Sequence, residues 1–192
     1  MSADWALFNL LNGLAGRSPQ LDNVVRFLMN DYALTTALVL LLLALWFSGE
    51  SPATRAHNQR GVLSAIASMF LGNVIVKAMN LAFYRYRPFA FNEVTVLFYY
   101  PSDSSFPSNA ACVGFAIATA VWLHNRNAGW VSYLLALLLG VSRIVGGVHY
   151  PSDILGGAVI GVVVAYLVAI KIPLFNRLWT ILIHKLRHLL LA

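Results

Sequence analysis

Residues 154–174 read ILGGAVIGVVVAYLVAIKIPL, and this stretch decides the class of the fold. The only charged residue in it is Lys171, close to its end. A helix needs about 20 mainly apolar residues to cross the hydrocarbon core of a bilayer. Because the stretch has that length and composition, it predicts a membrane-spanning helix.

Four segments upstream have the same character and predict four more spans. They are residues 32–49, 61–84, 108–124 and 127–142. The composition of the whole chain agrees, because 59% of its 192 residues are hydrophobic and 10% are charged, whereas soluble domains average about 25% charged residues. We therefore expect an all-α integral membrane protein with a single domain over residues 1–192.

Amphipathic helices are expected at both ends of this domain. Trp5–Leu14 is too short to span and is followed by a glycine and a proline, so it should lie on the membrane or pack beside it. Residues 176–192 mix apolar and basic side chains, a pattern typical of a helix in the membrane interface.

The formal net charge of +6 has a simple explanation in a membrane protein. The basic residues are scattered singly, so we expect them to set the topology and to contact anionic lipid, with no nucleic-acid partner. Loop 50–60, turn 124–127 and the C-terminal tail carry basic residues on one side. The positive-inside rule places that side in the cytoplasm and loops 85–107 and 144–153 outside.

The unusual polar residues gather where the spans end on the outer side. Arg85 and Arg87 follow the second span, and Arg143 closes the fourth. His149 and Asp153 lead into the fifth. Arginine side chains match phosphate oxygens, and a carboxylate bonded to an imidazole frees the other ring nitrogen as a nucleophile. The sequence therefore predicts phosphoryl transfer through histidine, with no metal and no other cofactor.

Each of these residues taken alone has a simpler interpretation. Ser108 and Asn109 are typical of a helix cap, and Asp153 would serve as a cap of the fifth span. His149 alone would be a hydrogen-bonded histidine at the interface. Lys77, near the end of the second span, would extend its ammonium group to the membrane surface.

The spacing of these residues resembles that of a known family. Ser142-Arg143, five residues, His149, three residues and Asp153 match the S-R-x5-H-x3-D motif of the type 2 phosphatidic acid phosphatase (PAP2) superfamily. Residues 107–110, Pro-Ser-Asn-Ala, resemble its P-S-G-H motif. Its K-x6-R-P motif aligns with residues 80–88, with Asn80 at the lysine position and Arg87-Pro88 as the Arg-Pro pair. The resemblance implies a PAP2-type transmembrane helical bundle that usually has six spans, so we expect five to six here.

The resemblance also implies roles for individual residues. His149 would be the nucleophile that forms a phosphohistidine, and Asp153 would orient it. The residues expected to hold the phosphate are Asn80, Arg87, Ser108, Asn109, Arg143 and Gly147, with Lys77 and Ser142 as further candidates.

Two departures from the family motifs matter for function. Asn80 stands in place of the lysine of the first motif and, with the surrounding residues, resembles the bacitracin-resistance subgroup, which dephosphorylates undecaprenyl diphosphate. Ala110 stands where the family has its general-acid histidine. Alanine cannot transfer a proton, and loss of a general acid slows a reaction by about 10²–10⁴. We interpret Ala110 as a His→Ala change, engineered or natural, in an otherwise intact site.

The expected function is hydrolysis of a lipid substrate, undecaprenyl (polyprenyl) diphosphate, to the monophosphate and inorganic phosphate. The expected place is the extracytoplasmic face of a bacterial inner membrane, where this reaction would recycle peptidoglycan precursors and confer bacitracin resistance. One alternative is a phosphatidic acid or phosphatidylglycerophosphate phosphatase that uses the same residues. Another is a non-catalytic phospholipid-binding membrane protein, and the oligomeric state stays open.

Overall fold

The computed structural model describes residues 3–30 and 32–188, and all the regular elements in that part of the chain are helices. In chain order they are α1 (Ala3–Asn12), α2 (Pro19–Met29), α3 (Ala33–Phe47), α4 (Pro52–Ala82), the 3₁₀ turn η1 (Pro88–Ala90), α5 (Asn109–His124), α6 (Arg126–Val145), α7 (Pro151–Tyr166), the π-helical turn η2 (Leu167–Lys171) and α8 (Pro173–His188).

Capping residues, rather than the edges of the apolar runs, decide where the helices begin. Ser51 caps α4 by accepting a hydrogen bond from the backbone nitrogen of Thr54 at 3.1 Å, and a proline occupies the first helical position. Asn125 caps α6 in the same way through the nitrogen of Ala128. Helix α4 therefore starts at Pro52, well before the span expected from residue 61, because a polar first turn is helical without being apolar.

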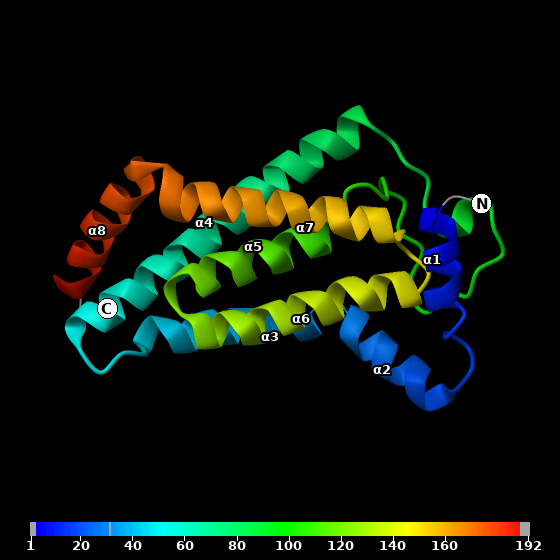
Figure 1. Ribbon diagram of the computed structural model, residues 1–192, viewed down its shortest axis with the longest axis horizontal. Coiled ribbons are helices and arrows are strands. Elements are labelled where there is room, and N and C mark those ends of the chain that lie inside the picture. Colours follow the sequence, from blue (N-terminus) through cyan, green and yellow to red (C-terminus); the bar gives the residue numbers. More distant parts are fainter. Residues whose placement is uncertain (1–2, 31, 189–192) are drawn as a thin grey trace.

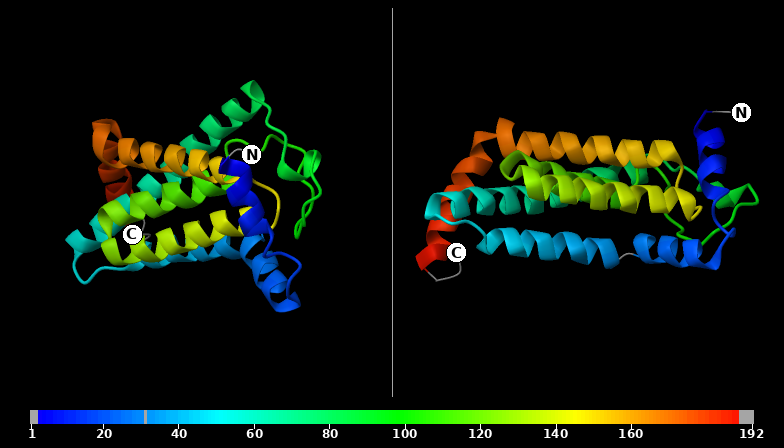
Figure 2. Two further views of the ribbon diagram at one scale, coloured as in Figure 1. Left: turned by 45° about the vertical axis from the view of Figure 1, so that its right-hand side comes forward. Right: turned by 60° about the horizontal axis from the view of Figure 1, so that its bottom comes forward.

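The long helices form a bundle with its functional loops at one end. Helices α6 and α7 run along the long axis of the molecule and α4 runs obliquely to it, with α5 packed against all three (Figure 1). The end of α4, the start of α5, the end of α6 and the start of α7 meet at the end where α1 lies (Figure 1). Helix α8 crosses the opposite end, as both views of Figure 2 show. The topology therefore brings the predicted polar residues to one end of the bundle.

Close contact between α5 and its neighbours depends on small residues. Methyl groups added at Gly157 and Gly161 of α7 would collide with backbone atoms of α5. A methyl group added at Gly72 of α4 would lie 2.7 Å from the sulfur of Cys112, which is buried in α5. Small residues at such crossings let helices approach closely and gain van der Waals contact inside a membrane. This packing fixes the start of α5 at the functional end.

Three helices of the described residues are long and apolar enough to cross a membrane: α4, α6 and the continuous α7–η2. Helices α2 and α3 would add a fourth span if they count as one, bent by 50° at a break that includes residue 31. Helix α5 has 16 residues and a length of about 24 Å, shorter than a hydrocarbon core of about 30 Å. The all-α membrane fold is confirmed, whereas the expected count of five to six spans is not.

The terminal helices lie against the bundle in different ways. Helix α1 buries Phe8 completely and contacts α6 and α7, so the N-terminal segment packs beside the bundle. Helix α8 buries Ile183 and donates a hydrogen bond from the indole nitrogen of Trp179 to the hydroxyl of Ser64 in α4, at 3.1 Å. Residues 189–192 of the predicted C-terminal amphipathic segment lie outside the described residues.

Candidate active site

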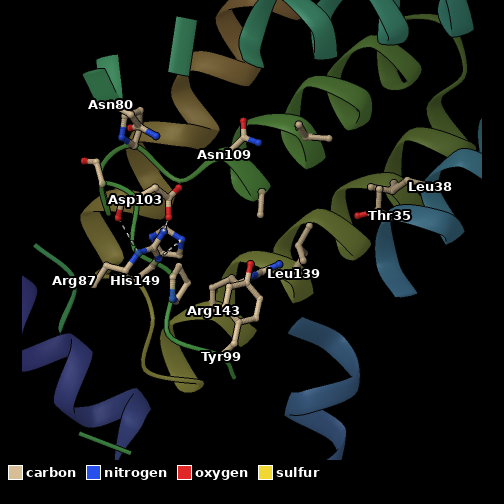
Figure 3. Close-up of a pocket in the computed structure, with 15 residues that line it drawn as sticks. Thr35, Leu38, Asn80, Arg87, Tyr99, Asp103, Asn109, Leu139, Arg143 and His149 are labelled. Carbon is tan, nitrogen blue, oxygen red and sulfur yellow. Dashed lines mark hydrogen bonds and ion pairs between the residues drawn. The ribbon is translucent and has the colours of Figure 1, made fainter. Parts of the chain in front are cut away.

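A cavity of about 310 Å³ opens at the functional end of the bundle, between the end of α4, the start of α5, the end of α6 and the loop before α7 (Figure 3). Residues far apart in the sequence share its wall. The predicted site residues that line it are Asn80, Arg87, Asn109, Ala110, Arg143 and His149. The structure thus places both predicted cavity arginines, the predicted nucleophile and the alanine of the second motif around one space.

His149 has partners that determine which ring nitrogen carries the proton. Its Nδ1 lies 3.0 Å from the carbonyl oxygen of Ser105 and 3.5 Å from the carboxylate of Asp153. Its Nε2 lies 3.2 Å from Nη1 of Arg87 (Figure 3). A carbonyl oxygen can only accept a hydrogen bond and a guanidinium can only donate one. Nδ1 therefore carries the proton, and Nε2 offers its lone pair at the cavity wall.

The protonation state of His149 suits a nucleophile. Burial lowers the pKa of His149 below its ordinary value of 6.5, and the charges of Arg87 and Arg143 lower it further. The hydrogen bond to Asp153 acts in the opposite direction without cancelling this effect. Because the pKa is lowered, the imidazole is neutral at neutral pH, which is the form that can attack phosphorus.

Asp153 is completely buried and receives several hydrogen bonds. Its carboxylate accepts from the hydroxyl of Ser105 and, at 2.7 Å, from the backbone nitrogen of Tyr150. Its other oxygen lies 2.6 Å from Nη1 of Arg85. The bond to Tyr150 is also the N-terminal cap of α7. The start of the helix therefore holds the carboxylate in the orientation that faces His149.

Arg85 lies on the far side of Asp153 and is not part of the cavity wall. Its Nη2 pairs with the carboxylate of Asp4 at 2.7 Å, and its Nη1 donates to the hydroxyl of Ser152 at 2.6 Å. Asp4 also accepts hydrogen bonds from the nitrogen and the hydroxyl of Ser152. This network connects α1 to the carboxylate that faces His149. Sequence reasoning grouped Arg85 with the cavity residues, and the structure separates them.

Arg87 and Arg143 provide the positive charge of the cavity, and both side chains are buried. Arg87 donates from Nη1 to the carbonyl oxygen of Val148 at 2.9 Å and from Nη2 to the carboxylate of Asp103 at 2.8 Å. The guanidinium of Arg143 lies 4.9 Å from the centre of the Phe98 ring. Such contacts hold the planar donors in place, which favours binding of an anion with several oxygens.

The first turn of α5 supplies the opposite wall through Asn109 and Ala110. Ser108 sits behind this turn as the helix cap. Its hydroxyl accepts from the nitrogen of Ala111 at 3.4 Å, and its own nitrogen donates to the carbonyl oxygen of Asp153 at 3.0 Å. Ser108 is fully buried and does not line the cavity. The cavity thus faces the N-terminus of a helix, whose partial positive charge attracts anions.

Besides Ser108 and Asp153, three other predicted residues are not in the wall of this cavity. Gly147 has a φ of +81°, and its nitrogen donates to the carbonyl oxygen of Ile144, so the turn itself requires the glycine. The hydroxyl of Ser142 donates to the carbonyl oxygen of Leu139 at 2.8 Å. Lys77 lines an adjoining cavity.

Sequence reasoning missed Asp103, Tyr99 and Thr35, which also line the cavity. The first two lie in the long loop between α4 and α5, where no periodicity indicates which side chains turn inward. The role of Asp4 was missed because its partner Arg85 is 81 residues away in the sequence. Among the described residues, no three His, Cys, Asp or Glu side chains form a group that could hold a metal ion.

The PAP2 superfamily profile matches residues 61–177 of the chain, more than half of its 192 residues. The chain belongs to the PAP2 superfamily. This membership confirms the resemblance read from the three motifs. The matched range runs from α4 into α8, so α1 with Asp4 lies before it.

Known proteins are similar to this PAP2 chain in sequence or in fold. It is 33% identical to the undecaprenyl-diphosphatase BcrC of Bacillus subtilis over 164 residues, which make up 85% of this chain and 81% of that protein. The crystal structure of LpxE from Aquifex aeolicus is similar at a TM-score of 0.68 and 28% identity, covering 90% of this chain and 97% of that one. A transmembrane PAP2-type phosphatidylglycerolphosphate phosphatase from Bacillus subtilis is similar at a TM-score of 0.59 and 23% identity, covering 87% and 85%.

Taken together, the PAP2 profile, these relatives and the apolar helices indicate a multi-pass membrane protein and a phosphoric ester hydrolase that acts on lipid. The similarity to BcrC also confirms the resemblance to the bacitracin-resistance subgroup.

Proposed function

We propose that this protein hydrolyses the terminal phosphate of a polyprenyl diphosphate, such as undecaprenyl diphosphate, through a phosphohistidine at His149. The observation that carries the proposal is the fixed tautomer of His149, with Nε2 unprotonated at a cavity that also contains two arginines. The similarity to BcrC, which is named an undecaprenyl-diphosphatase, supports the choice of lipid.

In the first step, Nε2 of His149 attacks the terminal phosphorus. A P–N bond forms while the P–O bond to the lipid monophosphate breaks, and the electron pair leaves with the bridging oxygen. Arg87 exchanges its hydrogen bond to Nε2 for one to a phosphate oxygen, and Arg143 binds another. Asp153 stabilises the positive charge that develops on the imidazole, because its carboxylate faces Nδ1.

In the second step, water attacks the phosphohistidine. The P–N bond breaks, inorganic phosphate forms and the electron pair returns to Nε2. The products are polyprenyl monophosphate and inorganic phosphate, and the site is ready for another substrate.

Ala110 makes the first step slow in this chain. Its side chain lines the cavity together with His149, so a histidine at this position would contact the leaving oxygen and protonate it. With alanine at this position the leaving oxygen has no proton donor, which lowers the rate about 10²–10⁴-fold. A lipid monophosphate is a weaker base than a lipid alkoxide, so this loss is smaller for a diphosphate substrate than for phosphatidic acid.

The distribution of charge supports an extracytoplasmic site. Arg55 and Arg126 lie close to the bundle end opposite the cavity, and Arg177 and Lys185 belong to α8 at that same end. Positively charged loops remain in the cytoplasm, so the cavity would face the other side of the inner membrane.

The test compares the parent chain with three variants, all purified in detergent. Ala110→His should release phosphate from undecaprenyl diphosphate about 10²–10⁴ times faster than the parent chain. Ala110→Gln adds a polar side chain that cannot act as an acid, so it should not raise the rate of phosphate release. The double variant Ala110→His, His149→Ala should be inactive. Radiolabelled terminal phosphate should be trapped on His149 after a rapid acid-free quench.

Two results would overturn the proposal. One is an Ala110→His chain that releases no phosphate from undecaprenyl diphosphate and forms no phosphohistidine. The other is an Ala110→His chain that prefers phosphatidic acid or phosphatidylglycerophosphate, which would assign the site to a different lipid.

A further inference from the structure

A second cavity, of about 450 Å³, adjoins the first. The two share wall residues, namely Asn80, Asp103, Ser104 and Asn109. A ligand that occupies the first cavity with one phosphate therefore has room to extend directly into the second.

One face of α4 forms much of the second cavity. The residues it contributes are Asn73, Val76, Lys77, Asn80 and Leu81, and Tyr84 follows just after the helix ends. Their spacing of three and four residues is that of a single helical face. Polar side chains and Lys77 lie along the same face as apolar ones. This combination suits a ligand with a charged group joined to a hydrocarbon chain.

Lys77 is the basic side chain of this wall, and it lies in the last turns of a membrane-spanning helix. Charged residues in spans are costly and are usually paired or functional. The long flexible stem of lysine carries a point charge that can adjust to a phosphate. The acidic residue of the shared wall is Asp103, whose carboxylate is paired with Arg87 at 2.8 Å, so it leaves the charge of Lys77 available to an anion.

Asn80 marks the boundary between the two cavities. Its Oδ1 is buried and has no hydrogen-bond partner among the described residues. A buried amide oxygen without a partner costs free energy, and a half-turn of the amide would put the donor Nδ2 at the same place. A phosphate group that bridges the cavities would satisfy that donor.

We propose that the second cavity binds the lipid-proximal phosphate of a diphosphate substrate, with Lys77 as its cationic ligand, and so makes the site selective for diphosphates. This inference rests on the proposed function. The terminal phosphate lies against Arg87, Arg143 and His149. The proximal phosphate lies beside Lys77 and Asn80, and the first carbons of the lipid continue along the apolar part of α4.

The slow turnover expected of Ala110 allows binding to be measured on the chain as it exists. The probes are farnesyl diphosphate and farnesyl monophosphate, titrated into protein in detergent by isothermal calorimetry. Lys77→Gln should weaken binding of the diphosphate about tenfold, the effect of losing one charge-assisted hydrogen bond. Binding of the monophosphate should change less than about twofold, because it fills the first cavity alone.

Two further variants sharpen the measurement. Lys77→Arg keeps the positive charge and should retain most of the preference for the diphosphate. Lys171→Gln makes the same charge change at the other end of the bundle, and should leave the binding of both probes unchanged. Retained binding of the monophosphate by Lys77→Gln also shows that this variant is folded.

Two outcomes would overturn the inference. Equal weakening of both probes by Lys77→Gln would place the lysine at the reacting phosphate, and no change with either probe would mean that its ammonium extends to the membrane surface. The proposed function has a separate readout, the release of phosphate by the Ala110→His chain. If the Ala110→His chain releases phosphate but Lys77→Gln does not change the preference for the diphosphate, only the second subsite is refuted. If the preference depends on Lys77 but no phosphate is released, only the proposed hydrolysis is refuted.

Discussion

Removal of Arg85 tests whether a residue outside the cavity orients His149, the proposed nucleophile. Arg85 is the charged partner of Asp153, at 2.6 Å, and joins it to Asp4, at 2.7 Å. In the parent chain one guanidinium pairs with both carboxylates. The substitution Arg85→Met removes it from both. One of them, Asp153, has no exposed side-chain surface. We expect Arg85→Met to lower the free energy of unfolding and to leave His149 less well oriented.

The size of the effect follows from burial. Breaking a fully buried ion pair by removing one partner costs about 3–5 kcal/mol. Arg85 is 35% exposed, so water replaces part of the lost interaction and we expect about 2–3 kcal/mol. For a chain of this size, that loss lowers the melting temperature by roughly 5–10 °C. A carboxylate that no longer holds the imidazole in place should also lower kcat by about 10²-fold, with a smaller change in KM.

The assay is phosphate release from undecaprenyl diphosphate by the Ala110→His chain, with melting temperature measured in the same detergent. Arg85→Lys keeps the charge but cannot bind two carboxylates with a planar fork, so it should be intermediate. Asp4→Asn removes the outer carboxylate alone and should cost about 1 kcal/mol with little loss of kcat. If Asp4→Asn and Arg85→Met lower the melting temperature equally and both keep full kcat, Arg85 serves to attach α1 and does not position Asp153.

Further predictions concern pH, helix packing and buried hydrogen bonds. Because burial lowers the pKa of His149 below 6.5, the Ala110→His chain should stay active below that pH and lose activity as the pH falls through the lowered pKa, in a pH–kcat/KM profile. Its folded state then binds fewer protons than its unfolded state, so melting temperature should fall with pH below 6.5. Gly157→Ala collides with the backbone of α5 and should cost about 1–3 kcal/mol; Gly140→Ala, which meets a side-chain methyl, should cost less in the same thermal scan. Asn12→Ala removes three hydrogen bonds to the chain around Thr95 and Val145, and should lower stability by about 2–3 kcal/mol.

The parts of the site that could be predicted are those whose geometry is local. Arg143, His149 and Asp153 occupy the last turn of one helix, a short loop and the first turn of the next. The eleven residues from Arg143 to Asp153 have few ways to fold in this arrangement, so their spacing in the sequence determines their positions in the structure. Arg87 was predictable for a different reason, because its place in the motif carries information from a whole family.

The spans were harder to predict, because a run of apolar residues can face lipid or pack against other helices, and the sequence does not distinguish the two. Residues 108–124 are as apolar as a span, yet α5 is surrounded by α4, α6 and α7 and is short for a bilayer. Its apolar surface is used for packing against neighbouring helices. Conversely, residues 50–60 were predicted to form a loop, although Ser51 and Pro52 start the helix there. Hydropathy therefore located the apolar centres of the long helices, whereas the capping residues determine where these helices begin.

Arg85 and Arg87 show why the remainder could not be predicted. They are two residues apart in the sequence and both reach the His149–Asp153 pair, but from opposite ends: Arg85 binds the carboxylate, and Arg87 contacts Nε2 of the imidazole. The difference arises from a distant partner, because Asp4 holds Arg85 behind the pair. Arg87 thereby remains at the cavity, where it can move from the imidazole to a phosphate. Two like charges in one loop therefore differ in role: Arg85 holds the carboxylate of Asp153, and Arg87, in the mechanism we propose, binds the phosphate of the substrate.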